Sequence, residues 1–330
     1  MTAFQGKKVC VVGHRGMVGN AIVRALAGYY CDILQLGRQE ADLREQQAVR
    51  GWFETNKPDF VFLAAAKVGG IAANDRHPAS FIYDNLMIEA NVVDAAYRAG
   101  AQKLLLLGSS CIYPKFAPQP IRETALLTGP LESTNQWYAI AKIAGLKLAE
   151  AYRLEHGADF ISGMPTNLYG PGDNFDLETS HVMPALIRKA VNAKINGEPE
   201  IVIWGTGKPL REFLHVDDCA AACLFLMEHY SDVEHVNIGS GHEISILNLA
   251  QMIAEVVGFQ GTIRLDDSRP DGTPRKLLDG EKLRRMGWRP RISLEAGVRA
   301  VASQFEAEQR ALSTADVVGR TRGASGRSTH

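Results

Sequence analysis

The chain has 330 residues, of which 46% are hydrophobic and 22% are charged, and its formal net charge is −1. This near-neutral balance argues against the basic face that nucleic-acid binding needs, and no run approaches the roughly 20 apolar residues that span a bilayer. Residues 1–8 contain no apolar signal-peptide segment, and the five cysteines form neither a metal nor a disulfide framework. We therefore expect a cytoplasmic protein that binds no metal, nucleic acid or membrane.

Short apolar strands alternate with amphipathic helices through the first half of the chain. The expected strands are residues 8–12, 33–36, 60–65, 103–107 and 159–164, and the expected helices are residues 18–27, 81–98 and 137–152. This alternation is typical of a parallel sheet with helices on both faces. It predicts an α/β fold with a Rossmann-type, doubly wound domain over residues 1–170.

The regular alternation ends near residue 170, where Pro, Gly and polar residues become frequent. Two further helices are expected at residues 245–257 and 293–306, each beginning at a serine cap. We expect residues 171–310 to form a smaller α/β substrate-binding domain, with some segments returning to the first sheet. Residues 311–330 are rich in Ser, Thr, Arg and Gly, a composition that predicts a disordered tail.

A glycine motif, G-H-R-G-M-V-G, lies between the first expected strand and the first helix. Its glycines, Gly13, Gly16 and Gly19, allow a sharp turn and let a pyrophosphate approach the amides of a helix N-terminus. A glycine triplet alone is weak evidence, but its position between strand and helix makes it much stronger. The motif predicts a dinucleotide cofactor.

The second strand lacks the acidic residue that usually accepts a hydrogen bond from the ribose 2′-hydroxyl of NAD. It is followed instead by Arg38, and Arg15 lies within the glycine motif. Guanidinium groups are suited to pairing with a phosphate. This pair of arginines favours NADP(H), which carries a 2′-phosphate.

A tyrosine and a lysine, Tyr138 and Lys142, stand one helical turn apart. A nearby cation favours the phenolate, so we expect Lys142 to lower the pKa of Tyr138 and to let it exchange a proton with a carbonyl or alcohol. Ser109 follows the strand at residues 103–107, at the end where open α/β sheets bind ligands. This set resembles the extended short-chain dehydrogenases. The resemblance implies that Ser109 and Tyr138 bind the substrate oxygen and that Lys142 also holds the nicotinamide ribose.

Longer motifs narrow this resemblance. They occupy residues 64–70, 108–114, 165–171, 211–218 and 270–279. From about residue 7 to 305 the chain resembles the GDP-L-fucose synthases, also called GDP-4-keto-6-deoxymannose 3,5-epimerase/4-reductases. The resemblance implies conversion of GDP-4-dehydro-6-deoxy-D-mannose to GDP-L-fucose, by epimerisation at C3 and C5 and then NADPH-dependent reduction at C4. It also implies a homodimer, with residues 81–98 and 137–152 as the candidate helical interface.

Epimerisation beside a C4 ketone needs a base, an acid on the opposite face and donors to the enolate oxygen. Cys111 is two residues after Ser109, so both would point to one side if the chain stays extended. Its thiol, with an ordinary pKa of roughly 8.5, would need tuning to act as the base. By resemblance His181 is the matching general acid, and Tyr138 supplies the proton in the final reduction.

The resemblance implies further binding residues. For the GDP-sugar they are Ser109, Ser110, Cys111, Asn167, Lys189, Trp204, Arg211 and Lys276. For the cofactor they are Gly13, Arg15, Gly16, Met17, Val18, Gly19, Arg38, Asp42, Leu43, Ala64, Ala65, Ala66, Leu107, Tyr138, Lys142, Pro165, Asn167, Leu168 and His181.

Several of these residues also have a structural interpretation. Arg211 and Lys276 suit a diphosphate, whereas Trp204 could equally be a packing residue. The family carries arginine at position 189, so Lys189 keeps the charge but loses the bidentate geometry. Glu212 could simply pair with a neighbouring base.

Two other classes of function stay open. A nucleotide-sugar 4-epimerase or 4,6-dehydratase shares the superfamily, but the Cys111 and His181 pair argues against the epimerase. A dehydratase would carry a threonine and an acidic residue in the region of residues 109–111, where neither is present. A cofactor-sensing protein without catalysis would be expected to lose Tyr138 or Lys142, and both remain.

Overall fold

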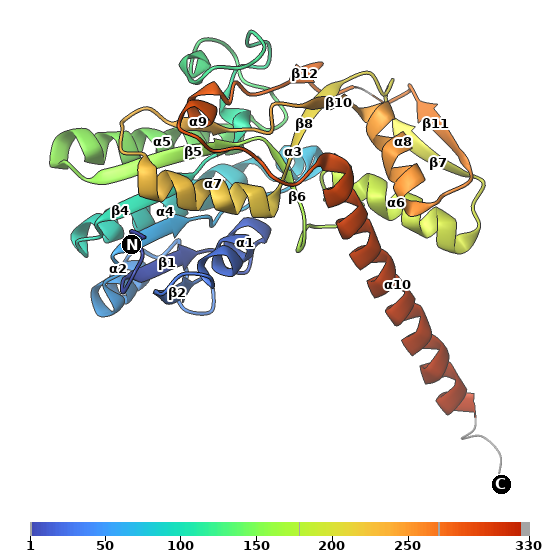
Figure 1. Ribbon diagram of the computed structural model, residues 1–330, viewed down its shortest axis with the longest axis horizontal. Helices are drawn as coiled ribbons and strands as arrows, with labels where there is room; N and C mark the ends of the chain where they lie inside the picture. The colour runs from blue at the N-terminus through green and yellow to red at the C-terminus, as the bar shows by residue number, and fades with distance from the viewer. Residues whose placement is uncertain (1, 178, 270, 325–330) are drawn as a thin grey trace.

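The computed structural model describes residues 2–177, 179–269 and 271–324. Its main sheet has six parallel strands in the order β2-β1-β3-β4-β5-β9 (Figure 1). The strands are β1 (Lys8–Val12), β2 (Asp32–Leu36), β3 (Phe60–Leu63), β4 (Lys103–Leu107), β5 (Asp159–Pro165) and β9 (Val236–Ile238). This sheet confirms the predicted Rossmann-type α/β fold.

Helices cover both faces of the sheet because side chains of successive strand residues point to opposite sides. Val9 and Val11 of β1 belong to a core cluster with residues of α1 (Met17–Leu26) and α7 (Val216–His229). Cys10 and Val12 belong to a second cluster on the other face, with α2 (Gln46–Asn56), α4 (Pro78–Arg98) and α5 (Gln136–His156). A short helix, α3 (Ile71–Arg76), precedes α4.

The expected elements of the first half are confirmed, with small shifts at their ends. β1 and β4 match the expected bounds, and α5 continues four residues beyond residue 152. β5 includes Pro165, which was expected to end it, since Pro165 pairs with Ile238 at the end of the short sixth strand. That strand comes from the second half of the chain, because β9 begins at Val236.

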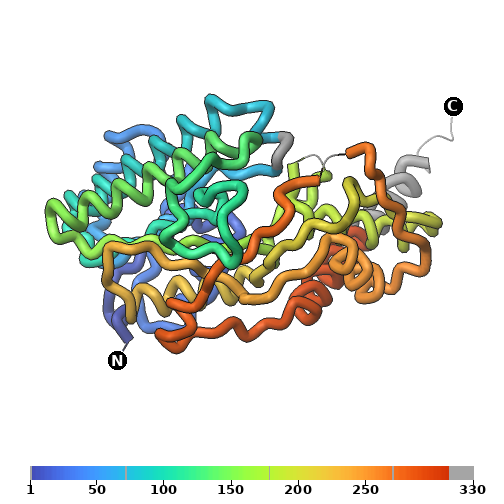
Figure 2. Tube along the Cα trace, turned by 90° about the horizontal axis from the view of Figure 1, so that it is seen from above, coloured from blue at the N-terminus to red at the C-terminus, as the bar shows by residue number. Residues whose placement is uncertain are grey.

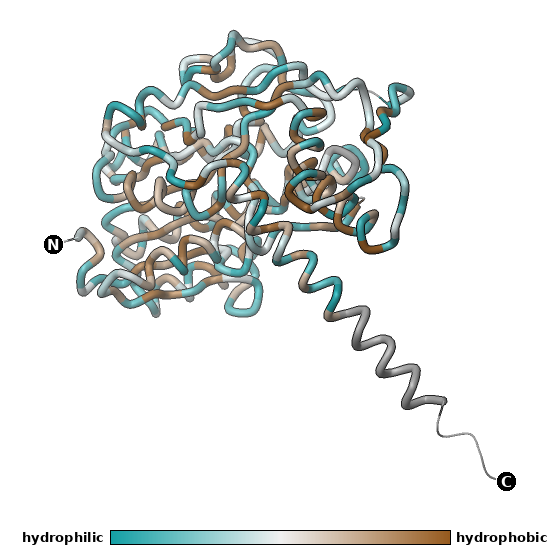
Figure 3. Tube along the Cα trace, turned by 45° about the vertical axis from the view of Figure 1, so that its right-hand side comes forward, coloured by the Kyte–Doolittle hydropathy of each residue, from teal (hydrophilic) through white to brown (hydrophobic). Residues whose placement is uncertain are grey.

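A second, smaller sheet is built around β8 (Leu210–His215). Its other strands are β6 (Asn167–Tyr169), β10 (Glu243–Ser245) and β12 (Arg275–Lys276). A two-stranded sheet of β7 (Glu200–Trp204) and β11 (Thr262–Asp266) lies nearby with α6 (Val182–Asn196) and α8 (Ile246–Val257). Hydrophobic segments concentrate inside both halves (Figure 3). After β12 the chain returns to the main sheet, where α9 (Glu281–Arg285) contacts β9 (Figure 2).

The last helix, α10 (Leu294–Ala324), corrects the expected start of the C-terminal tail. Ser293 caps it, with the amide of Ala296 donating to Oγ at 3.3 Å, and its distal end projects from the body (Figure 1). Residues 311–324 are helical rather than disordered, because extending an existing helix gains a hydrogen bond per residue. Residues 325–330 of the expected tail lie outside the described residues. Within the described chain, no helix is long and apolar enough to cross a membrane.

Candidate active site

Glycines let the loop between β1 and α1 turn tightly against neighbouring backbone. Gly13 has a φ of +88°, and a Cβ there would lie 2.7 Å from backbone atoms of Ala65. A Cβ on Gly19 would collide with the carbonyl oxygen of Gly13. The N-cap of α1 is Gly16, whose position carries no side-chain cap. The first amides of the helix are therefore available to an anion such as a pyrophosphate.

Two arginines, Arg15 and Arg38, lie near the end of β2. The Nε of Arg15 donates to Nε2 of His14 at 3.2 Å, and its guanidinium also bonds to Gln39. Arg38 follows β2 and is exposed. The nearest predicted acid, Asp42, is paired with Arg44 at 2.7 Å, and hydrogen bonds from Arg44 lower the pKa of Asp42 to about 2.

The remaining expected cofactor residues lie on the neighbouring strand ends of the same sheet. Ala64, Ala65 and Ala66 follow β3, and the amide of Ala64 donates to the carbonyl of Val12 at 3.0 Å. Leu107 ends β4 and Pro165 ends β5. The carboxyl ends of parallel strands form one edge, where ligands bind in this architecture. The other expected residues there are Met17 and Val18 at the start of α1, Leu43 before α2 and Leu168 in β6.

Ser109 and Cys111 are brought together by a cap, which differs from the extended arrangement expected from sequence. Ser109 is the N-cap of a short 3-10 helix, η1 (Ser110–Ile112), and its Oγ accepts a hydrogen bond from the amide of Cys111 at 3.4 Å. The chain turns here because the hydroxyl satisfies an amide that would otherwise lack a partner. The Ser109 hydroxyl therefore contacts the backbone amide of Cys111. The two side chains are not brought to one side by an extended strand.

Cys111, His181 and Lys276 are electrostatically coupled. Cys111 is buried, which raises the pKa of its thiol, whereas the charge of Lys276 and the hydrogen bond to Ser109 lower it. His181 is the N-cap of α6 and reaches solvent, yet desolvation by the surrounding cleft lowers its pKa, and Lys276 lowers it further. Lys276 and Cys111 also line one cavity, together with Ser110 and Arg275. One cation therefore acts on both candidate proton-transfer groups.

The tyrosine–lysine pair has the expected spacing but a different electrostatic setting. Lys142 Nζ lies 5.8 Å from the centre of the Tyr138 ring, and it donates to the Leu107 carbonyl at 2.9 Å. It also pairs with Glu89 of α4 at 2.8 Å. The expected lowering of the Tyr138 pKa is wrong for this structure: burial, then Cys111 and Glu89, raise that pKa well above its ordinary value. Glu89 offsets the charge on which the expectation depended.

The expected phosphate-binding cations stand side by side. Lys276 of β12 pairs in register with Arg211 of the parallel strand β8. Burial lowers the pKa of Arg211, and Asp271 opposes this shift. Asn167, on β6, donates from its amide to the carbonyl of Glu212 at 2.8 Å. Residues in register on adjacent strands share a face of the sheet, so Arg211 and Lys276 present two positive charges together.

Trp204 belongs to a second cluster at the end of β7. Its side chain is 62% exposed, so it is not a core packing residue. Lys189 Nζ lies 5.6 Å from its ring centre and donates to the Val202 carbonyl at 2.8 Å. Arg269, which the sequence analysis missed, lies 5.1 Å from the same ring. The strand that carries Trp204, β7, lies in the smaller lobe, away from α5 (Figure 1).

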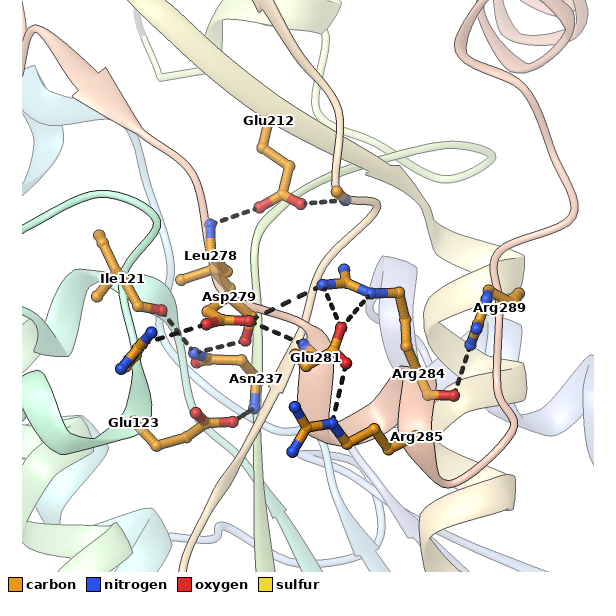
Figure 4. Close-up of polar contacts among 12 residues, drawn as sticks. Ile121, Glu123, Glu212, Asn237, Leu278, Asp279, Glu281, Arg284, Arg285 and Arg289 are labelled. Atoms are coloured by element: carbon orange, nitrogen blue, oxygen red, sulfur yellow. Dashed lines mark hydrogen bonds and ion pairs between the residues drawn. The ribbon is translucent and has the colours of Figure 1, made fainter.

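Glu212 has backbone partners rather than the expected base. Its carboxylate is fully buried and accepts hydrogen bonds from the amides of Leu278 at 3.0 Å and Gly241 at 2.7 Å (Figure 4). Asn237 makes a similar link, donating from its side chain to the Ile121 carbonyl at 2.9 Å. Glu212 thus joins the segment after Lys276 to β8 and to the turn after β9, and Asn237 joins β9 to the segment at Ile121.

Sequence reasoning also missed Glu89, although a signal was available. It lies four residues after Asn85 on the periodic face of its helix, where apolar residues were expected. It is 1% exposed. A buried acid on such a face needs a cationic partner, and Lys142 provides it.

Comparison with known proteins gives consistent results. The model of the NAD dependent epimerase/dehydratase family matches residues 9–239. GDP-L-fucose synthase of Sinorhizobium fredii is 60% identical over 92% of this chain and 97% of its own length. The Escherichia coli GDP-L-fucose synthase is 50% identical over 91% of this chain and 96% of its own. A GDP-L-fucose synthetase structure from Naegleria fowleri with bound NADP is 31% identical, with a TM-score of 0.86 over 94% of this chain and 96% of that one.

Proposed function

The chain belongs to the NAD dependent epimerase/dehydratase family, and from this premise we propose that it converts GDP-4-dehydro-6-deoxy-D-mannose to GDP-L-fucose. One arrangement in the structure supports the proposal: Cys111 lies on η1, which packs against α5, the helix of Tyr138 and Lys142, and it lines one cavity with Lys276. The charge of Lys276 acts on the pKa of both Cys111 and His181. A simple ketoreductase needs only the tyrosine, lysine and serine. The added thiol and imidazole supply the base and acid that two epimerisations require.

NADP(H) fits the residues at the sheet edge. Gly13 and Gly19 allow the tight turn that brings the chain into α1, and the N-terminus of α1, which has no side-chain cap, is open to a pyrophosphate. Arg15 and Arg38 are placed for a 2′-phosphate, and Asp42 is occupied by Arg44. When bound, the cofactor supplies the hydride that reduces C4.

In the epimerisation half of the reaction, Cys111 is the base and His181 the acid. The thiolate removes the proton from C3 or C5, and the electron pair moves to the C4 oxygen. Ser109 and Tyr138 stabilise that enolate oxygen by hydrogen bonding. His181 then returns a proton to the opposite face of the carbon. Lys276 supports this step because its positive charge opposes the rise in the Cys111 pKa caused by burial.

In the reduction half, Tyr138 donates a proton to the C4 oxygen. The raised pKa of Tyr138 keeps the phenol protonated at neutral pH, which is the state a proton donor needs. Lys142 lies one turn further along α5, where its ammonium stabilises the phenolate that forms. The same lysine is placed to hold the nicotinamide ribose.

The other end of the substrate, GDP, occupies the smaller lobe. Arg211 and Lys276 bind the diphosphate as a pair of adjacent cations. Trp204 offers an exposed aromatic face beside Lys189. Residues 1–170 therefore mainly carry the cofactor and residues 171–310 mainly carry the nucleotide-sugar, while β9 returns from the second half to the main sheet.

We further propose a cytoplasmic homodimer formed by α4 and α5. Large apolar side chains are exposed on these helices: Tyr83 and Tyr97 on α4, and Trp137, Ile140 and Leu154 on α5. All five cysteines are free, as is typical of a reducing compartment. Light scattering tests the assembly: wild type should be dimeric and Ile140→Asp largely monomeric. A monomeric wild type would contradict the dimer.

The activity is tested by incubating the purified chain with GDP-4-dehydro-6-deoxy-D-mannose and NADPH, with product identification by NMR. We expect NADPH consumption and a product inverted at both C3 and C5. A product reduced at C4 with unchanged C3 and C5 would leave a ketoreductase. Cofactor binding without NADPH consumption would instead favour a sensor.

A further inference from the structure

Lys142 forms a buried ion pair with Glu89. Lys142 takes part in the proposed reduction, whereas Glu89 has no role in it so far. Glu89 Oε1 lies 2.8 Å from Lys142 Nζ, and both side chains are 2% exposed. Glu89 belongs to α4 and Lys142 to α5, so the pair joins two packed helices. A buried carboxylate is costly in a protein interior, and its placement here therefore calls for a reason.

The surrounding helix leaves room for this carboxylate. A Cβ on Gly145 would overlap Oε2 of Glu89, so glycine at that position of α5 accommodates the acid. Glycine in a helix interior costs about 0.5–1 kcal/mol relative to alanine. Gly145 is therefore less favourable for the helix than alanine, but it leaves the space that the Glu89 carboxylate occupies.

The pair fixes the position of the lysine. Lys142 Nζ makes two contacts, to Glu89 and to the carbonyl of Leu107 at the end of β4. These contacts anchor the ammonium between α4 and the strand end next to Ser109. The titratable groups facing Tyr138 are Cys111 from η1, Glu89 from α4 and Lys142 from its own helix. The charge on Glu89 therefore reaches the phenol as well as the lysine.

We propose that Glu89 is a positioning residue for the reduction step: it anchors the Lys142 ammonium at the end of β4 and balances the charge of that ammonium next to the Tyr138 ring. This inference rests on the proposed function. It concerns the reduction half alone, because Glu89 is buried behind Lys142 and acts through it. Tyr138 also donates to the enolate oxygen, but its phenol stays protonated at neutral pH because its pKa is raised well above the ordinary value, so we expect little change in proton exchange at C3 and C5.

The first test is Glu89→Gln, which keeps the side-chain shape and removes its charge. Without the carboxylate, the phenolate of Tyr138 is less disfavoured, so the Tyr138–Lys142 couple loses its proton at lower pH. In the pH profile of the single-turnover reduction rate, the fall in rate at alkaline pH (the alkaline limb) should begin about one pH unit lower than in wild type. At a given pH within that fall, the rate should be roughly tenfold lower. Deuterium exchange at C3 and C5 without NADPH should stay within about twofold of wild type.

Three further variants separate this role from packing. Glu89→Asp restores the charge and should move the limb back toward wild type. Gly145→Ala pushes the carboxylate from its place and should shift the limb in the same direction as Glu89→Gln, by less. The matched control is Asp94→Asn on the same helix, which removes a carboxylate that pairs with Arg50 at 2.8 Å. Its pH profile should superimpose on wild type.

A second readout needs no substrate. NMR of the protein carrying carbon-13-labelled tyrosine, with Tyr138 assigned from Tyr138→Phe, follows ionisation of the phenol directly. In Glu89→Gln the Tyr138 titration should move about one pH unit lower than in wild type. An unmoved titration and an unmoved limb in Glu89→Gln would overturn the inference, even where overall activity falls. A wild type that consumes no NADPH overturns the proposed function instead, and the tyrosine titration then decides the inference alone.

Discussion

In the nucleotide-binding half, β3 and β4 are buried along their whole length, whereas the centre of the smaller sheet, β8, depends on a buried carboxylate. Glu212 accepts amides from two distant segments and so joins strands only two or three residues long. Both halves have an apolar core, but the short strands around β8 are joined by a few polar anchors, whereas the strands of the main sheet pack through continuous apolar faces. The comparison indicates that one polar residue, Glu212, can decide whether the substrate site forms. The cofactor site depends instead on the backbone conformation of the glycine loop.

The largest expected effect is on the smaller lobe. Glu212→Ala leaves two buried amides without an acceptor, at about 1–3 kcal/mol each. Urea unfolding should show this loss, and GDP binding should weaken more than NADPH binding. The matched control is Glu243→Ala on β10, whose ion pair with Arg275 is partly exposed and should contribute about 0–1 kcal/mol. An equal loss of unfolding free energy in Glu212→Ala and Glu243→Ala would contradict a special role of Glu212 in the smaller lobe.

The junction between the halves should be sensitive to acid. His235 is buried next to the Tyr113 hydroxyl at 2.9 Å, and burial lowers its pKa to about 4. The unfolded chain takes up this proton below about pH 6.5. Stability should therefore fall as pH drops from about 6.5 to 4, by about 3 kcal/mol in total.

Chemical denaturation across that pH range tests this prediction. His235→Gln should flatten the slope, and His242→Gln, at an exposed position, should leave it unchanged. If the free energy of unfolding has the same dependence on pH in wild type and in His235→Gln, His235 is not the source of the acid sensitivity.

A smaller effect is expected at the cofactor loop. In Gly19→Ala the added methyl group meets the Gly13 carbonyl, and accommodating it should cost about 1–3 kcal/mol. NADPH binding by calorimetry should weaken roughly 10- to 100-fold, with GDP binding unchanged. Equal weakening of both ligands would mean that the two halves are not separable in this way.

The smallest effect is expected at Gly51, which differs from Gly19 in having space for a side chain. Gly51 lies exposed within α2 with nothing near its Cβ position. Gly51→Ala should stabilise the protein by about 0.5–1 kcal/mol and leave NADPH binding unchanged. Thermal unfolding and calorimetry check it, and a destabilised variant would contradict the assignment of Gly51 as a plain helical position.

The sequence predicted the first half well because β1, β3 and β4 carry continuous apolar runs and alternate with amphipathic helices. β1 and β4 end where the hydrophobic pattern ends. In the second half, β9 and β12 have three and two residues, too few for a periodic signal. The partners of Glu212 come from Gly241 and Leu278, and no local pattern links positions so far apart.

The candidate site was predictable in its members but not in its electrostatics. The Tyr138–Lys142 spacing placed both residues on one helix face, as expected. The pKa of Tyr138, however, is raised by burial, then by Cys111 and by Glu89 from another helix, and the contact between Ser109 and Cys111 depends on a helical cap. Such effects arise from tertiary contacts, which spacing along the chain does not encode.

The central claim is that one cleft carries two chemistries on separable groups of residues. NMR of the substrate in heavy water tests it most directly, in wild type, Cys111→Ser and Tyr138→Phe. The account predicts that Tyr138→Phe still incorporates deuterium at C3 and C5, more slowly because Ser109 alone then holds the enolate oxygen, while losing reduction about 100- to 10,000-fold. Cys111→Ser should incorporate none. Full exchange in Cys111→Ser would contradict the account, because the base would then lie elsewhere.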